Sequence, residues 1–221
     1  GTLVLPRKPS EIVMQLSSHA IRHQQPIPAE YAFCQPGADS PCVLSSNRNP
    51  DLHWQDAPVA TGSYALICVD PDVPSVATDV NQPDREVHDA LPRVDFVHWL
   101  IANIPANVTS IAAGACSEGI TARGKALPTG PEGSVQGRND YTAWFKGDPD
   151  MEGLYLGYDG PCPPFNDAKV HRYFFRLFAL DVAQLELPHG FGMTELHRAM
   201  QGHILAETAL YGTYTLNARL R

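Results

Sequence analysis

The stretch GPCPPFNDAKVHRYFFRLFAL, residues 160–180, contains two features that decide how this chain folds. Three of its first five residues are proline, which fixes φ and removes backbone donors, so residues 160–164 are expected to form a rigid loop. The stretch ends in a bulky, almost unbroken apolar run from Tyr173 to Leu180. Such a run is typical of a strand that is covered on both faces. The sequence therefore predicts a stiff loop followed by a buried strand.

Two other segments also read as buried strands. Residues 64–70 (YALICVD) and 96–104 (FVHWLIANI) are largely apolar at consecutive positions, so both of their faces are expected to be covered. Alternation in the second segment predicts that His98 shares a face with Leu100, with Trp99 on the opposite face.

The C-terminal part contains the clearest helical pattern. Residues 193–210 place apolar side chains, among them Leu196 and Met200, at the 3.6-residue period. We therefore predict one helix over this range, with Thr194 as its N-cap and Gly212 beyond its end.

A long glycine- and proline-rich region, residues 105–157, separates the second predicted strand from the loop at 160–164. Loops of this length usually carry function or wrap a site. Because strands dominate the middle of the chain and a helix follows, we expect a mainly β sandwich with appended helices. Residues 1–221 are expected to form one domain. Residues 1–30 form a weakly patterned N-terminal segment, with a short strand at 12–16.

Composition and charge restrict the classes of partner. The net charge is −8, from 24 acidic and 16 basic residues, and no basic run occurs. A nucleic-acid groove or a patch for anionic membranes is therefore not expected. No apolar run approaches the roughly 20 residues of a transmembrane helix. An anion bound by this chain needs a local pocket that works against the overall charge.

The five cysteines are odd in number and show no C-x-x-C spacing, so neither a zinc knuckle nor a full disulfide framework is indicated. Cys34 and Cys42 are close enough in sequence to close a small loop, but free thiols are the default expectation. The chain begins at Gly1 without an initiator Met. We expect the cytoplasm as its compartment, with the periplasm left open, because a cleaved signal peptide leaves no trace in the mature chain.

Three segments carry candidate chemistry. Asp70 and Asp72 lie in a turn stiffened by prolines, where a carboxylate can accept an imidazole N–H and favour the charged ring. His171 and Tyr173 share a strand face by the period of two. Together with His98, they predict a site in which one anion collects two imidazole donors and one phenol.

The loop at 160–164 supplies a wall for this predicted pocket. Its prolines, Pro161 among them, leave Gly160 and Cys162 as the residues with backbone N–H groups. Glycine would also permit close approach of an oxyanion. A purely structural turn explains the same rigidity, so the loop alone does not decide between the two interpretations.

These motifs resemble those of the phosphatidylethanolamine-binding proteins, which include the Raf kinase inhibitor proteins, and especially their bacterial branch. The resemblance spans residues 30–216 and rests on the combination of DPDVPS (70–75), HW (98–99), GPCPP (160–164) and HRY (171–173). It implies two antiparallel sheets packed as a sandwich, with a small anion pocket at one end. The residues that match the lining of that pocket are Asp70, His98, Gly160, His171 and Tyr173.

Two segments depart from the family pattern. Residues 142–153 look like an insertion that could cover or narrow the pocket, although a segment with no role is an equal alternative. Residues 165–170 differ from the short glycine-containing link that the resemblance leads us to expect before His171.

The residues and the resemblance together predict a non-catalytic protein that binds phosphate- or carboxylate-bearing ligands, such as a phospholipid head group, without a cofactor. The family also includes kinase and protease inhibitors, so a regulated protein partner is a further expectation, and a homodimer is left open. The alternative is a metal-dependent enzyme that uses Asp70, His98 and His171 as a two-histidine, one-carboxylate set. His19 and His23, four residues apart, are interpreted as polar surface residues because no acidic third ligand lies nearby in the sequence.

Overall fold

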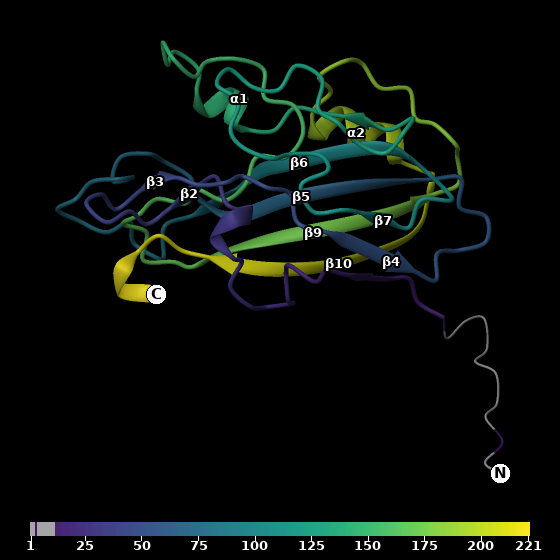
Figure 1. Cartoon of the computed structure of the whole chain (residues 1–221), viewed down its shortest axis with the longest axis horizontal. Coiled ribbons are helices and arrows are strands. Elements are labelled where there is room, and N and C mark those ends of the chain that lie inside the picture. Colours follow the sequence, from purple (N-terminus) through teal and green to yellow (C-terminus); the bar gives the residue numbers. More distant parts are fainter. Residues whose placement is uncertain (1–2, 4–11) are drawn as a thin grey trace.

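The computed structural model describes residue 3 and residues 12–221, so part of the predicted N-terminal segment lies outside the described residues. The described chain forms antiparallel sheets with a helix packed on one side (Figure 1). Among the helices described, none has both the length and the apolar character needed to cross a membrane.

The central layer is a five-stranded antiparallel sheet in the order β10-β9-β5-β6-β8. The strands predicted at 64–70, 96–104 and 173–180 are confirmed and extend beyond those limits. The sheet comprises β5 (Ser63–Pro74), β6 (Arg93–Pro105), β8 (Val135–Gln136), β9 (His171–Leu180) and β10 (Ile204–Tyr214).

A three-stranded antiparallel sheet, in the order β1-β4-β7, forms the second layer, and a β2-β3 hairpin stands apart from both. The first strand begins at residue 15, later than the predicted position. These short strands are β1 (Gln15–Ser17), β2 (Cys34–Gln35), β3 (Val43–Leu44), β4 (Leu52–Gln55) and β7 (Ser110–Ile111). The helical elements are η2 (Ala29–Tyr31), α1 (Tyr141–Trp144), α2 (Met193–Met200) and η3 (Ala218–Leu220).

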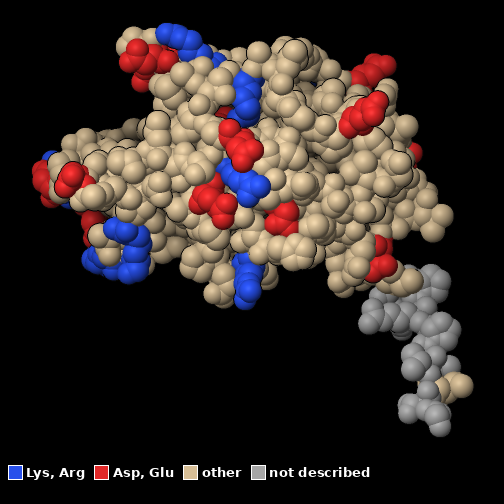
Figure 2. Space-filling model, viewed as in Figure 1, with Lys and Arg blue, Asp and Glu red and all other residues tan. Residues whose placement is uncertain are grey.

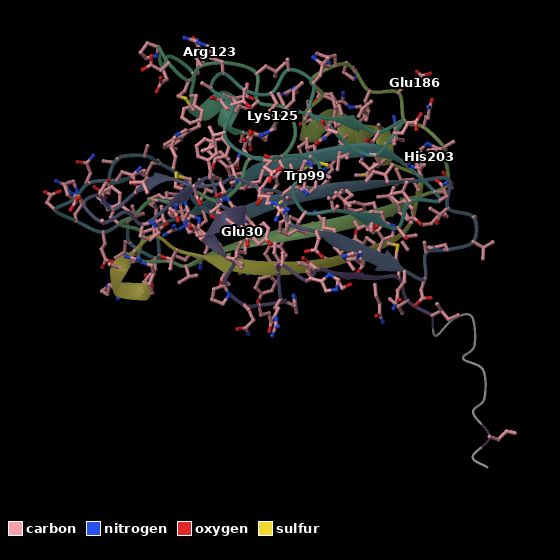
Figure 3. The ribbon with its side chains drawn as sticks, viewed as in Figure 1. Glu30, Trp99, Arg123, Lys125, Glu186 and His203 are labelled. Carbon is pink, nitrogen blue, oxygen red and sulfur yellow. A yellow bond between two sulfur atoms is a disulfide. The ribbon has the colours of Figure 1, made fainter. Side chains whose placement is uncertain are left out.

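Two hydrophobic clusters hold these layers together. The larger one fills the space between the two sheets and joins Trp54 of β4 to Trp99 of β6 and Phe175 of β9; Trp99 lies in the middle of the molecule (Figure 3). The smaller one covers the opposite face of the five-stranded sheet, where Leu196 of α2 packs. The predicted sandwich of antiparallel sheets is thus confirmed, with α2 on its outer side.

A bulge in β6 overturns the predicted facing of its side chains. Cys68 of β5 pairs with Trp99, but the next residue, Val69, pairs with Val97, so His98 is left over in the register. A bulge of this kind shifts the alternation by one residue. Trp99 consequently packs between the sheets, whereas Leu100 packs in the cluster beneath α2. The prediction that alternation continues through His98 was wrong.

The predicted helix over 193–210 is also wrong in its second half. α2 ends at Met200, and Gly202 adopts a φ of +82°, a conformation that suits glycine and stops a helix. The residues that follow pair with β9 as strand β10, from Ile204 opposite Leu180 to Tyr214 opposite His171. The N-cap is Gly192 rather than Thr194: the Gly192 N–H donates to Glu195 Oε2 at 3.1 Å.

The cysteine prediction needs a correction too. Cys34 is joined by a disulfide to Cys162, 128 residues away, and not to Cys42. Cys42, Cys68 and Cys116 are free thiols. The pairing follows from the fold, because the N–H groups of Phe33 and Cys34 both donate to the carbonyl of Pro161 and bring the two segments together.

Candidate functional site

A cavity of about 240 Å³ opens at the end of the molecule where α1, β2 and β3 lie, on the left of Figure 1. Most of its wall is apolar. The segment predicted as an insertion, together with the start of α1, contributes part of this wall. The aromatic side chains that line the cavity are Phe33, Phe96, Tyr141, Trp144 and Phe145.

Beside Asn81, four polar side chains from the central sheet line the same cavity: Asp70 from β5, His98 from β6, and His171 and Tyr173 from β9. All four are buried. They come from three neighbouring strands, because β5 pairs with β6 on one side and with β9 on the other. The sequence prediction that these residues converge is therefore matched by their positions.

His171 is held between two carboxylates. Its Nδ1 lies 2.6 Å from Asp70 Oδ2, and its Nε2 lies 2.6 Å from Asp167 Oδ2. Burial alone would lower the pKa of His171, but the hydrogen bonds to Asp167 and Asp70 outweigh it and raise the pKa to about 9. The ring is therefore a cation at neutral pH, and both of its N–H groups donate to carboxylates. The expected role of His171 as a direct donor to an anion does not fit this geometry.

Asp167 is the residue that the sequence interpretation missed. It lies in the 165–170 link, which departs from the family pattern, and it contacts His171 four residues later. The Arg93 Nη1 donates to the same Asp167 oxygen at 2.6 Å. Burial opposes ionisation, but the hydrogen bonds from His171 and Arg93 prevail and lower the pKa of Asp167. The signal that the sequence offered for this contact was an acidic residue four positions before His171.

The charges in this network balance. Asp70 and Asp167 carry two negative charges, while His171 and Arg93 carry two positive charges. The Asp72 N–H donates to Asp70 Oδ1 at 2.7 Å, which fixes the second oxygen of that carboxylate. The floor of the cavity thus contains a saturated ion network with no net charge, and it does not attract an anion by charge alone.

His98 differs from His171 in having one ring nitrogen engaged. Its Nδ1 donates to the carbonyl of Asp159 at 2.7 Å, and its Nε2 has no hydrogen-bond partner in the described part of the chain. Burial lowers the pKa of His98, which keeps the ring neutral at pH 7. The ring lies 4.9 Å from that of Phe96 and 5.2 Å from that of Tyr173. Nε2 is consequently the imidazole nitrogen available to a ligand.

Asp159, whose carbonyl orients His98, is itself anchored by polar partners. Its side chain accepts hydrogen bonds from the Nδ2 groups of Asn47 and Asn139, both at 2.8 Å. The Lys125 amino group lies 3.3 Å from Asp159 Oδ1 and donates to the Tyr158 carbonyl at 2.8 Å. Buried polar groups that are fully paired in this way rigidify their surroundings. The anchored Asp159 carbonyl therefore fixes the orientation of the His98 ring.

Tyr173 supplies a hydroxyl group to the cavity. Burial, followed by the negative charge of Asp70, raises the pKa of Tyr173 well above its ordinary value. A hydrogen bond with the Asp70 carboxylate also contributes to the raised pKa of Tyr173. The phenol therefore keeps its proton over the accessible pH range, and a ligand competes with Asp70 for it.

Three predicted site residues lie outside the cavity lining: Asp72, Gly160 and Pro161. Asp72 forms a bidentate pair with Arg172, at 3.0 Å to both Nε and Nη2.

Gly160 contacts other parts of the chain rather than the cavity. The Gly160 N–H donates to Asn47 Oδ1 at 2.7 Å, and a Cβ at Gly160 would lie 2.2 Å from the Tyr31 carbonyl. Glycine is required here for the approach of the chain's own backbone rather than of an oxyanion.

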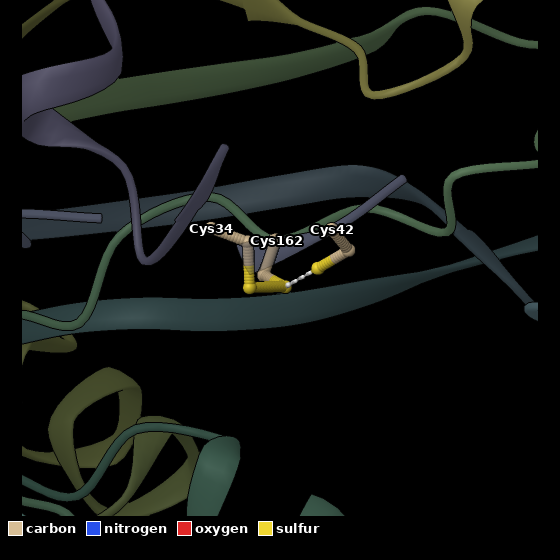
Figure 4. Close-up of side chains that lie close together, drawn as sticks. All are labelled: Cys34, Cys42 and Cys162. Atoms are coloured by element: carbon tan, nitrogen blue, oxygen red, sulfur yellow. Dashed lines mark hydrogen bonds between the residues drawn. A yellow bond between two sulfur atoms is a disulfide. The ribbon is translucent and has the colours of Figure 1, made fainter. Parts of the chain in front are cut away.

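Cys162 does line the cavity, as a disulfide partner and not as a thiol. The Cys42 Sγ lies 4.0 Å from the Cys162 Sγ, so three sulfur atoms are grouped at the cavity wall (Figure 4). Burial raises the pKa of the Cys42 thiol.

The structure does not assemble the metal set of the alternative hypothesis. In the described residues, two other groups bring three ligand atoms within 4.8 Å of one another: Cys34, Cys42 and Cys162, and His19, Asp51 and His53. His171 offers neither ring nitrogen to a metal, because each is bonded to a carboxylate.

The molecular face in Figure 2 carries scattered acidic and basic side chains without a large basic patch. The net charge of the whole chain is −8.

Comparisons with known proteins extend over nearly the whole chain. Residues 17–215 match the family described as "Phosphatidylethanolamine-binding protein". A UPF0098 protein of Methanothermobacter thermautotrophicus is 35% identical over 201 residues, covering 91% of this chain and 98% of that protein. A UPF0098 protein of Chlamydia pneumoniae is 33% identical over 207 residues, with the same two coverages.

Solved structures agree with the fold. The crystal structure of CT736 from Chlamydia trachomatis, described as a homologue of the same family, has a TM-score of 0.63 and 29% identity. It covers 92% of this chain and 98% of that one. The crystal structure of YbcL from Escherichia coli has a TM-score of 0.64 at 24% identity, with coverages of 91% and 98%, and supports the fold alone.

Proposed function

Because this chain belongs to the phosphatidylethanolamine-binding protein family, we propose that its cavity binds a small phosphate- or carboxylate-bearing ligand without transforming it. The observation that carries the proposal is the pairing of a neutral, rigidly oriented His98 with the Tyr173 phenol in a mostly apolar cavity. The ion network of His171 serves as a neutral floor that holds Asp70 in place.

The ligand chemistry follows from these groups. Tyr173 donates an O–H, and His98 Nε2 can accept a hydrogen bond when neutral or donate one when protonated. A phosphate or phosphoester meets both groups, since its oxygens accept and its monoprotonated form also donates. The aromatic wall fits an apolar or flat substituent next to the phosphate. A phospholipid head group and a free phosphoester share this chemistry.

A non-catalytic role is supported by the state of the reactive groups. Both ring nitrogens of His171 are engaged by carboxylates, and the Cys162 sulfur is tied up in a disulfide. A general base or a nucleophile needs a free lone pair within reach of the substrate. His98 Nε2 has one, but in the described residues it is hydrogen-bonded to no hydroxyl or thiol that it could activate as a nucleophile.

Calorimetric titration tests the proposal. Phosphorylethanolamine and inorganic phosphate would be titrated into the wild type, His98→Ala and His203→Ala. His203 is a matched control because it is half-exposed and pairs with Asp181 outside the cavity. We expect His98→Ala to weaken binding at least tenfold and His203→Ala to leave it unchanged. Equal heats from all three proteins, or none from the wild type, would refute the assignment.

A regulatory role, like that of a kinase or protease inhibitor, extends the same proposal, because a phosphorylated or acidic protein segment carries the same anionic group.

We also propose an oxidising compartment for this protein. Disulfides persist mainly in oxidising compartments, so the Cys34–Cys162 bridge favours such a compartment over the cytoplasm that we expected.

A further inference from the structure

His19, Asp51 and His53 form a cluster with no residue in the cavity lining. His53 lies on β4, Asp51 directly precedes β4, and His19 lies in the turn that follows β1. The His19 Nδ1 lies 3.0 Å from Asp51 Oδ2, and the His53 Nε2 lies 2.8 Å from the same oxygen. The sequence offered no acidic partner for His19. The pairing of β1 with β4, Ser17 opposite His53, supplies one.

The carboxylate at the centre of this cluster is fixed by the backbone. Asp51 Oδ1 accepts hydrogen bonds from the Ser18 hydroxyl at 3.1 Å and the Ala20 N–H at 2.9 Å, and Oδ2 accepts from the His19 N–H at 2.9 Å. The Asp51 side chain is only 13% exposed, whereas those of His19 and His53 are 88% and 42% exposed. The ligand oxygen is therefore held in place while solvent reaches both imidazoles.

The spacing of these atoms suits a metal ion. Zinc lies about 2.0–2.2 Å from imidazole nitrogen and carboxylate oxygen, which places neighbouring ligand atoms roughly 2.9–3.5 Å apart. The two distances to Asp51 Oδ2 lie at or just below this range. The two imidazole nitrogens lie within 4.8 Å of each other, and a rotation of the exposed His19 ring would bring them to the same ion. We propose that His19, Asp51 and His53 bind a divalent transition metal of the zinc class, with water in the remaining positions. Metal binding would displace the protons that now join the imidazoles to Asp51.

Titration of zinc chloride into tag-free, oxidised protein tests this proposal. The wild type is expected to bind one equivalent, while His19→Ala and His53→Ala bind at least tenfold more weakly. His23→Ala is the matched control, since His23 accepts the Tyr211 N–H and lies outside the cluster. The histidine variants are preferable to Asp51→Asn, because Asp51 also holds the turn. Unchanged zinc binding in both cluster variants, or no zinc binding by the wild type, would overturn the proposal. Cys42→Ser tests the other group of three ligand atoms, Cys34, Cys42 and Cys162. Zinc binding that is lost only in Cys42→Ser would also overturn the proposal.

A different observation, the sulfur group at the cavity wall, carries a second inference. The free Cys42 thiol lies 4.0 Å from the Cys162 sulfur of the Cys34–Cys162 disulfide (Figure 4). Cys34 begins β2 and Cys42 directly precedes β3, so the two residues belong to the two arms of one hairpin. Either strand of the hairpin is therefore within reach of the loop that carries Cys162.

We infer that Cys42 exchanges with this disulfide. Because burial raises the pKa of Cys42, only a small fraction of the thiol loses its proton to solvent at neutral pH. That thiolate attacks the Cys162 Sγ, the Cys42–Cys162 bond forms, and Cys34 leaves as a thiolate that takes up a proton. One disulfide is present before and after, so no oxidant or reductant is consumed. The exchange moves the attachment of the 160–164 loop from β2 to the start of β3. Because Cys34, Leu44 and Cys162 line the cavity, the exchange regulates ligand affinity, a consequence that rests on the proposed function.

Peptide mapping after acid quench and alkylation tests the exchange. In the wild type and in Cys116→Ser we expect the Cys42–Cys162 disulfide beside the Cys34–Cys162 disulfide, and in Cys42→Ser only the Cys34–Cys162 disulfide. Air-oxidised Cys34→Ser supplies the reference map of the Cys42–Cys162 form, and a wild type that shows only the Cys34–Cys162 disulfide would refute the exchange. Alkylation of both Cys42 and Cys162 in Cys34→Ser would refute the inference.

Phosphate titration then compares the two locked forms, Cys34→Ser and Cys42→Ser, for which at least a threefold difference in affinity is expected. Equal affinities would overturn the regulatory consequence. If phosphate binds to no form, the proposed function fails, while the peptide map still decides the exchange.

Discussion

At the scale of single residues, the sequence grouped candidate residues that lie together but did not predict the hydrogen bonds of each one. Asp70, His98, His171 and Tyr173 meet in one cavity as predicted. His171 is nevertheless a saturated cation, because Asp167 folds back onto its second nitrogen. A hydrogen-bond partner in an irregular link cannot be assigned by periodicity. The chemistry of each histidine was therefore decided by its neighbours.

The raised pKa of His171 predicts a dependence of stability on pH. Its pKa is about 9 in the folded protein against an ordinary value of 6.5. The stabilisation is therefore complete below pH 6.5 and is lost as the pH rises to 9, with a total on the order of 3 kcal/mol. Urea unfolding at pH 6.5 and pH 9.5 measures this loss. His171→Asn should show a much smaller difference between the two pH values, and an equal difference would contradict the prediction.

The lowered pKa of His98 predicts that an anion binds together with a proton. Burial keeps the ring neutral in the free protein, and a negative charge at Nε2 favours its protonated form. Binding of dimethyl phosphate, whose charge is constant in this range, should therefore be tighter at pH 6 than at pH 8. Calorimetry in two buffers of different ionisation enthalpy measures the proton uptake. His98→Asn should bind without it, and a pH-independent affinity in the wild type would count against His98.

At the scale of elements, the errors arose where local pattern and tertiary pairing disagreed. Residues 204–210 continue the helical period of α2, yet they pair with β9 because an edge of the five-stranded sheet is available to them. β6 was predicted at the right place, but a bulge at His98 changed which side chains face each cluster. Burial against a partner outweighs intrinsic preference in both cases.

Gly202 is predicted to fix the boundary between α2 and β10. Its φ is +82°, and a Cβ there would have no atom within 4 Å, so an alanine would be strained without being crowded. Gly202→Ala should lower the free energy of unfolding by about 1 kcal/mol. Gly202→Asn should cost less, since asparagine tolerates this conformation. Thermal or urea unfolding measures the free energy of unfolding of both variants. If neither substitution changes it, the boundary between α2 and β10 does not depend on Gly202.

At the scale of the whole molecule, one covalent link joins distant parts of the chain. The Cys34–Cys162 disulfide spans 128 residues and connects the β2-β3 hairpin to the loop before β9. A loop of this length restricts the unfolded chain strongly. The link also fixes the wall of the cavity relative to its floor, because Cys34 and Cys162 both line it.

Loss of the disulfide is therefore predicted to destabilise the whole domain. Cys162→Ser, which removes both pairings open to Cys162, should lower the free energy of unfolding by about 2–4 kcal/mol. Cys42→Ser is the control, because it keeps the Cys34–Cys162 bond and should change stability by less than about 1 kcal/mol. Equilibrium urea unfolding under non-reducing conditions compares them. Similar losses in the two variants would show that the cysteine volume, not the bond, matters.

The sequence by itself determined the buried strands of the central sheet and, with them, the strand positions of Asp70, His98, His171 and Tyr173, together with the proline-rich 160–164 loop. These follow from runs of apolar side chains and from proline, whose effects are local. Only the tertiary structure decided that Asp167 and Arg93 neutralise the cavity floor, that Cys34 pairs with Cys162, and that β10 replaces half of a helix. Each depends on segments distant in sequence that become neighbours only when the sheets pack, and no local pattern encodes such a contact.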